Sequence, residues 1–410
     1  MGQSTFPVPS SGSSTSTILP VNASSVILDG SLTTAGTYTT TVNGNGGIAY
    51  LVATDNPATI TVSGTAYSVP SNTVVASKAF GSSTSVTVAA TTSYSGAPTS
   101  FTAATLSSAN AWTSVAYGNG YYVAVQQSGT TAGAYSTNGT TWSASTMPTT
   151  GSIFGWNNVS FGNGYFIAVA STGTSHGYST NGTTWTALTM PSSQNWTCST
   201  YGNGYFVAVA QSTTAGAYSS NGTSWTASTM PSAAAWNSVA YGNGYFVAVA
   251  SGPSNSAAYS TNGTTWTAST LSSSAAWYGV AYGQISATNY FVAVQGSAST
   301  AGSYSTNGTT WTASTMPSAN AWHSICYGGG YFVAVAQTGS TGFAAYSSNG
   351  TTWSAANLPS SSAWNGVIWG NGYYVAVQIS GTTAGAYFSQ TATPILPVNF
   401  GIYNGPTTIN

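Results

Sequence analysis

The chain has 410 residues, of which 42% are hydrophobic, 13% aromatic and only 1% charged. Asp29, Asp55 and Lys78 are its only Asp, Glu, Lys or Arg residues, so residues 93–410 carry no such side chain. Nucleic-acid binders need cations to neutralise phosphates and peripheral membrane proteins need them for anionic lipids, so the composition excludes both partner classes. Its hydrophobic content is too high for a disordered chain and indicates a folded protein with a hydroxyl-rich surface.

The first segment, residues 1–24, is rich in Ser, Thr, Gly and Pro, and we predict that it forms a flexible N-terminal arm. It lacks the charged and apolar regions of a secretory signal peptide. No apolar run in the chain approaches the roughly 18–20 residues of a membrane span. We therefore expect no signal-directed secretion and no membrane insertion.

Residues 25–92 are predicted to form a small β domain, similar in size to a β-sandwich or jelly roll. Runs of β-branched and aromatic residues indicate strands at 37–42, 48–53, 58–62 and 85–89. Asp29 and Asp55 each adjoin turn-forming residues and are expected in turns. We expect this domain to serve attachment or oligomerisation.

Residues 93–390 consist of internal repeats. Each repeat opens with a tryptophan, and successive openings are 40 to 45 residues apart. These tryptophans are Trp112, Trp156, Trp196, Trp236, Trp277, Trp322 and Trp364. In the repeat that begins at Trp236, the runs WNSVAY, YFVAVA, AAYS and TTWTAS predict four strands, because Gly-Asn-Gly and Asn-Gly turn signals separate them. Seven such units predict an all-β fold, a seven-bladed β-propeller with four-stranded blades.

The seventh repeat lacks its fourth strand, because no Asn-Gly turn and no Trp-containing strand follow its third. A matching segment, residues 100–106, precedes the first repeat, and Phe101 lies 11 residues before Trp112, the same spacing as in later repeats. We therefore predict that this N-terminal segment supplies the outer strand that closes the ring. Residues 391–410 are then left as a C-terminal tail.

The segment Ile-Leu-Pro-Val-Asn occurs twice, at residues 18–22 and 395–399. One interpretation is a chance similarity or a shared linker. The other is that both copies dock in equivalent grooves, in one chain or in neighbouring chains, which would suit an oligomer.

The turn between the third and fourth strands carries a recurring motif of the form YSTNGTTW. Its six copies end at Trp142, Trp185, Trp225, Trp266, Trp311 and Trp353. The motif resembles the Asp-box, or BNR-like, repeat of sialidase-type propellers, which also places Ser, Gly and Trp around this hairpin. It differs in having Asn in place of Asp and a turn one residue shorter. The resemblance implies a structural role for the motif and carries over no catalytic residue.

Side chains suited to acid, base or metal chemistry are scarce in the repeats. Glycoside hydrolysis normally uses two carboxylates, and residues 93–410 contain none. His176 and His323 lie in the second and sixth repeats, too far apart around the ring to share a metal. Cys198 and Cys326 also lie in different repeats, which argues against a disulfide. We therefore expect no enzymatic activity, no metal and no cofactor.

Ligand binding is the remaining expectation. The loop between the second and third strands varies among repeats, whereas the turn between the first and second is nearly constant, so the variable face is the candidate surface. The seven repeat-opening tryptophans begin the inner strands on that face, and together with His176 and His323 they are the predicted ligand-binding residues. Aromatic faces beside hydroxyl and amide groups suit sugars. The alternative is that these tryptophans pack blade against blade.

The runs of Ser, Thr, Gly and Asn, the start Met-Gly-Gln-Ser-Thr-Phe-Pro-Val-Pro and the YSTNGTTWT repeats are similar in style to bacteriophage tail-fibre and virion appendage proteins. This resemblance implies a structural protein on the virion surface, present as a homo-oligomer or in many copies beside other virion proteins. An outward-facing propeller would adhere multivalently to host-surface glycans. A capsid or tail decoration protein without a ligand, and a cellular lectin or surface adhesin, are the alternatives.

Overall fold

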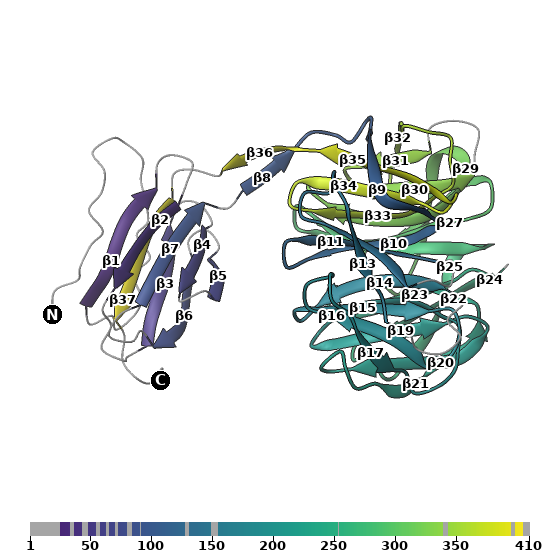
Figure 1. The fold of residues 1–410 in the computed structure, drawn as a ribbon, viewed down its shortest axis with the longest axis horizontal. Helices are drawn as coiled ribbons and strands as arrows, with labels where there is room; N and C mark the ends of the chain where they lie inside the picture. The colour runs from purple at the N-terminus through teal and green to yellow at the C-terminus, as the bar shows by residue number, and fades with distance from the viewer. Residues whose placement is uncertain are drawn as a thin grey trace. The chain divides into compact units, whose positions relative to one another are not determined.

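The computed structural model describes residues 25–32, 37–42, 48–54, 58–62, 65–69, 73–79, 84–90, 92–127, 131–148, 155–252, 254–338, 343–394 and 398–404. Before residue 93, it describes side chains only at positions 58, 59 and 61. The chain divides into two compact units, residues 1–95 with 392–410 and residues 96–391. Every regular element in the described ranges is a β-strand (Figure 1). The predicted arm, the first Ile-Leu-Pro-Val-Asn copy and Asp55 lie outside these ranges.

The first unit contains two four-stranded antiparallel sheets among its described residues. One sheet has the order β1 (Ser25–Leu32), β37 (Val398–Asn404), β3 (Ile48–Thr54) and β6 (Thr73–Ala79). The other has the order β2 (Thr37–Val42), β7 (Thr84–Ala90), β4 (Ala58–Val62) and β5 (Thr65–Val69). β8 (Thr92–Ser95) and β36 (Thr391–Pro394) pair with each other. The four strands predicted here are therefore present as β2, β3, β4 and β7.

Two expectations for this unit are corrected. β37 lies between β1 and β3, so residues 398–404 are part of a sheet and not of a tail. Its sequence, VNFGIYN, alternates apolar and polar residues with the period of a strand, a signal that the sequence analysis missed. Asp29 pairs with Gly401 inside β1 and is not in a turn. Residues 395–397 of the second Ile-Leu-Pro-Val-Asn copy lie outside the described ranges, and the last two begin β37.

The second unit repeats a four-stranded antiparallel sheet, and seven such blades can be counted in its described residues. The first strands of the blades are β10 (Trp112–Gly118), β14 (Trp156–Gly162), β18 (Trp196–Gly202), β22 (Trp236–Gly242), β26 (Trp277–Ile285), β29 (Thr312–Gly328) and β33 (Trp364–Gly370). The second strands are β11 (Tyr121–Gln126), β15 (Tyr165–Ala170), β19 (Tyr205–Ala210), β23 (Tyr245–Ala250), β27 (Thr288–Gln295), β30 (Tyr331–Thr338) and β34 (Tyr373–Gln378).

The outer half of each blade completes the repeat. The third strands are β12 (Ala132–Ser136), β16 (Ser175–Ser179), β20 (Thr213–Ser219), β24 (Ser254–Ser260), β28 (Ser299–Ser305), β31 (Ala344–Ser347) and β35 (Thr382–Ser389). The fourth strands are β13 (Ser143–Thr146), β17 (Thr186–Thr189), β21 (Thr226–Ala234), β25 (Thr267–Ala275), the first part of β29, β32 (Ser354–Ala356) and β9 (Thr102–Asn110). β9 precedes the first blade in sequence but pairs with β35 of the seventh.

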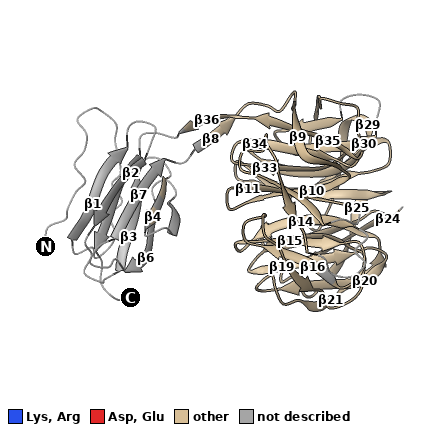
Figure 2. Cartoon of the chain, viewed as in Figure 1, with Lys and Arg blue, Asp and Glu red and all other residues tan. Residues whose placement is uncertain are grey.

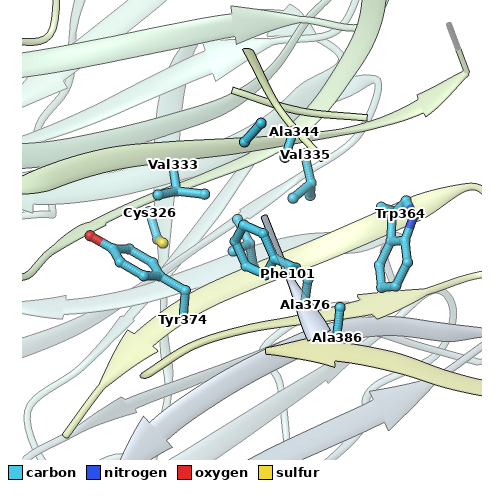
Figure 3. Packing of buried hydrophobic residues seen from close by; sticks show 11 residues of the cluster. Phe101, Cys326, Val333, Val335, Ala344, Trp364, Tyr374, Ala376 and Ala386 are labelled. Atoms are coloured by element: carbon cyan, nitrogen blue, oxygen red, sulfur yellow. The ribbon is translucent and has the colours of Figure 1, made fainter. Parts of the chain in front are cut away.

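An aromatic side chain of each blade packs closely against a glycine of the blade before it. The glycine that ends a first strand lies under the aromatic residue of the next blade, so a Cβ added at Gly202 would be 1.9 Å from the Tyr241 ring. The same contact joins the seventh blade to the first, where a Cβ on Gly370 would be 2.2 Å from Tyr117. Only glycine leaves room for such close packing. The core between the sixth and seventh blades is built from both of these blades and from Phe101 (Figure 3).

The hairpins between third and fourth strands share one hydrogen-bond pattern. In the fourth blade, the Ser260 hydroxyl accepts the N–H groups of Asn262 (3.3 Å) and Gly263 (2.8 Å). The Asn262 side-chain oxygen in turn accepts the N–H groups of Thr264 and Thr265, both at 3.0 Å. Each polar side chain of the motif therefore satisfies backbone donors that the tight turn leaves unpaired.

Gln390, near the end of the second unit, contacts the sixth and seventh blades, and we call Gly329, Trp369 and Gln390 together the latch. The buried Gln390 side chain donates to the carbonyls of Gly329 (2.9 Å) and Gly96 (3.1 Å) and accepts the indole N–H of Trp369 (2.8 Å). The latch joins the point where the chain begins this unit to the sixth and seventh blades.

Candidate functional site

The seven repeat-opening tryptophans are core residues. Each is at most 1% exposed. In six of them the indole N–H donates to the carbonyl four residues earlier, as Trp236 does to Ser232 at 3.1 Å. No ring face is open to a ligand, which corrects the expectation that these residues bind sugar. A residue this large is placed in every blade because it fills the space between neighbouring sheets.

His176 is also buried, with no exposed surface. Its Nδ1 atom accepts the Ala170 N–H at 2.9 Å, which places the proton of the neutral ring on Nε2. Burial lowers the pKa of this imidazole to about 4. His176 therefore lies in the second blade as a neutral core residue and is not placed to meet a ligand at the surface.

The candidate site is a channel of about 320 Å³ lined by residues from the first strands of all seven blades. The residue after each repeat-opening tryptophan lines it, and we call this ring the collar. The collar consists of Thr113, Asn157, Thr197, Asn237, Tyr278, His323 and Asn365. Of the predicted site residues, only His323 belongs to it. The other collar residues were missed, although their variation between the constant Trp and Gly of each strand is visible in the sequence.

Hydrogen bonds from the collar link successive blades. Thr113 Oγ1 donates to the carbonyl of Trp156 at 2.6 Å, and Thr197 Oγ1 to that of Trp236 at 2.7 Å. The equivalent bonds run from Asn157 to Trp196, from Asn237 to Tyr278, from His323 to Asn365 and from Asn365 to Thr113. Collar side chains thus bond six pairs of neighbouring inner strands, the pair in blades five and six being the exception, and the last of these contacts joins the seventh blade to the first.

In most blades another polar or sulfur-containing side chain lies one residue further along the first strand. The Ser114 hydroxyl accepts the Val159 N–H at 3.2 Å, and Ser238 accepts the Val280 N–H at the same distance. Cys198 takes this position in the third blade, and burial raises the pKa of its thiol. The thiol therefore stays protonated near neutral pH and is a poor nucleophile.

The chemistry of the channel is neutral and hydrogen-bonding. In Figure 2 no segment in the described part of the second unit is coloured as acidic or basic, because residues 93–410 contain no Asp, Glu, Lys or Arg. Burial lowers the pKa of the His323 imidazole to about 4, with the bond to the Asn365 carbonyl acting in the opposite direction. No group of three or more His, Cys, Asp or Glu that suits a metal occurs among the described residues. The described chain also has no helix long and apolar enough to cross a membrane.

Comparison with known proteins gives matches in structure only. The sequence matches no family model and no curated protein. Virginiamycin B lyase from Staphylococcus aureus is similar with a TM-score of 0.60 at 11% identity, over 70% of this chain and 98% of that one. A streptogramin B lyase gives 0.61 at 13% identity, over 70% and 97%. YCF48 bound to a D1 peptide gives 0.55 at 15% identity, over 74% and 98%.

These similarities show a multi-bladed, antiparallel β-propeller-like fold with repeated four-stranded sheets. They also correct the expectation that the chain has no enzymatic activity. Two of the structures are lyases, so a fold of this kind also occurs in enzymes. At 10–13% identity the likeness extends to the fold and to no residue role.

Proposed function

We propose that this chain is a structural protein of a virion, a phage tail fibre or similar appendage, whose propeller adheres to glycans on the host surface. The observation that carries the proposal is the neutral channel, whose walls offer hydroxyl, carboxamide and imidazole groups and no charged side chain in the described structure. Neutral glycans present the complementary groups, since each hydroxyl both donates and accepts hydrogen bonds.

In this proposal the repeats form a closed, seven-bladed ring. Three contacts support closure: β9 pairs with β35, Asn365 donates to the Thr113 carbonyl, and Tyr117 covers Gly370. The hairpin motif acts as an Asn variant of the Asp-box, because its Ser and Asn side chains bond the turn backbone in all six copies. The first unit, with its two four-stranded sheets, would attach the protein to the particle in many copies.

A channel without charges has a measurable consequence for binding. Adhesion through hydrogen bonds and ring contacts between neutral groups does not depend on screening by salt. Single sites of this kind are weak, so display in many copies would supply the avidity. Binding should therefore require multivalent presentation and should be the same at low and high ionic strength.

The experiment is a glycan array probed with the full-length chain, displayed multivalently on beads, at 20 mM and 500 mM salt. We expect a subset of neutral glycans to bind equally at both salt concentrations. Absence of binding to every glycan under multivalent display would contradict adhesion and favour a decoration protein without a ligand. Sequencing of the flanking genes separates the cellular alternative: capsid and tail genes are expected, whereas cell-wall genes would favour a lectin or surface adhesin.

A further inference from the structure

The collar departs from its pattern at one place, where blades five and six meet. Tyr278 donates no hydrogen bond to its neighbour, and its ring instead lies against the His323 ring, with centroids 5.0 Å apart and an angle of 44° between the planes. The Tyr278 hydroxyl has no partner in the described structure, and it is not among the buried unpaired atoms. A hydroxyl that is neither paired nor buried is open to a ligand.

A glycine at position 296 makes room for the Tyr278 ring. A Cβ on Gly296 would lie 2.4 Å from the Tyr278 ring, so only glycine fits below it. The Gly296 N–H donates to the carbonyl of Ala276, the residue before Trp277. At the equivalent position, blades one to four carry Gln or Ser and blade seven carries Ile. The Tyr278 ring therefore occupies space that a larger residue at position 296, just after β27, would fill.

Hydrogen bonds orient the His323 and Asn237 side chains next to Tyr278. His323 donates from Nδ1 to the Asn365 carbonyl at 3.0 Å, which leaves Nε2 of the neutral ring as an acceptor. Asn237 donates from Nδ2 to the Tyr278 carbonyl at 2.7 Å, and its Oδ1 atom has no partner in the described part of the chain. Tyr278, His323 and Asn237 thus hold a donor and acceptors in place before a ligand arrives.

We propose that Tyr278, His323 and Asn237 form a subsite for one neutral sugar residue in the channel; this inference rests on the proposed glycan adhesion. The Tyr278 hydroxyl, Nε2 of His323 and Oδ1 of Asn237 would bond to the hydroxyls of the sugar. The channel volume of about 320 Å³ is near the lower limit of ligand pockets, which limits the site to a terminal residue. Sialylated glycans are disfavoured, because no cation of the described channel would pair with their carboxylate.

The test uses the full-length chain and an array of galactose-, glucose-, mannose- and N-acetylglucosamine-terminated glycans with their sialylated counterparts. The variants Tyr278→Thr and His323→Asn install residues that other blades carry at the same collar position. We expect each to weaken binding to the neutral glycans at least tenfold. The control Thr267→Ser changes an exposed residue of the outer strand β25, which does not line the channel, and should leave binding unchanged. Tryptophan fluorescence during thermal unfolding verifies that all three variants fold.

A second measurement does not depend on any variant. The chain has only two histidines, so its imidazole NMR spectrum contains one set of signals from His323 and one from the buried His176. The monosaccharide that terminates the best array glycan should shift the His323 signal and leave that of His176 in place. Glycan binding that leaves His323 unshifted, or that survives both substitutions, would overturn the subsite but not the adhesion. A wild-type chain that binds no glycan would overturn both.

Discussion

Substitution of Gln390 tests whether the hydrogen bonds of the latch stabilise the second unit. Gln390→Ala removes three hydrogen bonds, to the Gly329 carbonyl, the Gly96 carbonyl and the Trp369 indole. A buried hydrogen bond contributes about 1 kcal/mol on balance, so the variant should lose about 3 kcal/mol of unfolding free energy. Because the three partners belong to different parts of the second unit, the loss should appear in the global unfolding transition of that unit.

The partner substitution is Gly329→Asn, which installs the residue that five other blades carry at this turn. The backbone conformation at this position already suits asparagine, since Gly329 has φ 51° and Asn119 at the equivalent position has φ 48°. The obstacle is the latch, because a Cβ at Gly329 would lie 1.7 Å from the Gln390 side-chain oxygen. Gly329→Asn should therefore expel Gln390 and cost about the same 3 kcal/mol.

In the Gln390→Ala background the same asparagine has space and a compatible φ, so its additional cost should be close to zero. The double-mutant cycle should consequently give a coupling energy of about 3 kcal/mol between the two positions. Urea unfolding followed by tryptophan fluorescence is the assay, and all 14 tryptophans lie between residues 112 and 369, so the signal reports the second unit alone. Equal costs for Gly329→Asn in both backgrounds, or no effect of Gln390→Ala, would refute the latch.

Three further predictions use the same assay. Gly202→Ala places a Cβ 1.9 Å from Tyr241 and should cost several kcal/mol or prevent folding; a loss below about 1 kcal/mol would contradict the interlocking of blades. Ser260→Ala leaves two hairpin N–H groups without their acceptor and should cost roughly 1–2 kcal/mol, and an unchanged urea midpoint would show that the motif is dispensable. Burial lowers the pKa of His176 and of His323 to about 4, below the 6.5 of an unfolded histidine. Between these values only the unfolded state binds the protons, so stability should fall from pH 6.5 to pH 4, by up to about 3 kcal/mol per imidazole, and level off below; a flat profile would argue against neutral buried rings.

The strands of the second unit could be predicted because their signals are local. Short runs of β-branched and aromatic residues separated by Gly-Asn-Gly turns mark β22 and β23, and the period of the tryptophans gives the number of repeats. β37 escaped prediction for the opposite reason. Its partners β1 and β3 lie more than 340 residues earlier in the chain, and no turn signal connects it to either. A strand that completes a distant sheet has only its own short alternation to identify it.

The site was predicted less well than the fold, because burial and hydrogen bonding across blades decide it. A tryptophan in every repeat can equally be a ligand platform or a packing residue, and only the position of the neighbouring blade distinguishes the two. The structure shows packing, with Trp236 fully buried. The polar residue after it, Asn237, bonds to a carbonyl 41 residues away. Nothing next to Asn237 in sequence indicates that partner, although the varied polar residues at this position do indicate the channel wall.

Exceptions to the repeat become informative when they meet in space. A lone substitution in one blade has many explanations, but Gly329, Trp369 and Gln390 depart from their equivalents together and contact one another. Tyr278 and Gly296 do the same in the channel, yet the outcome differs. Every polar atom of the Gln390 side chain is paired within the protein, which is what a structural contact requires. Gly296 makes room for the Tyr278 ring, yet the Tyr278 hydroxyl has no partner in the described structure. An unpaired hydroxyl adds little to stability, so a ligand explains this arrangement better.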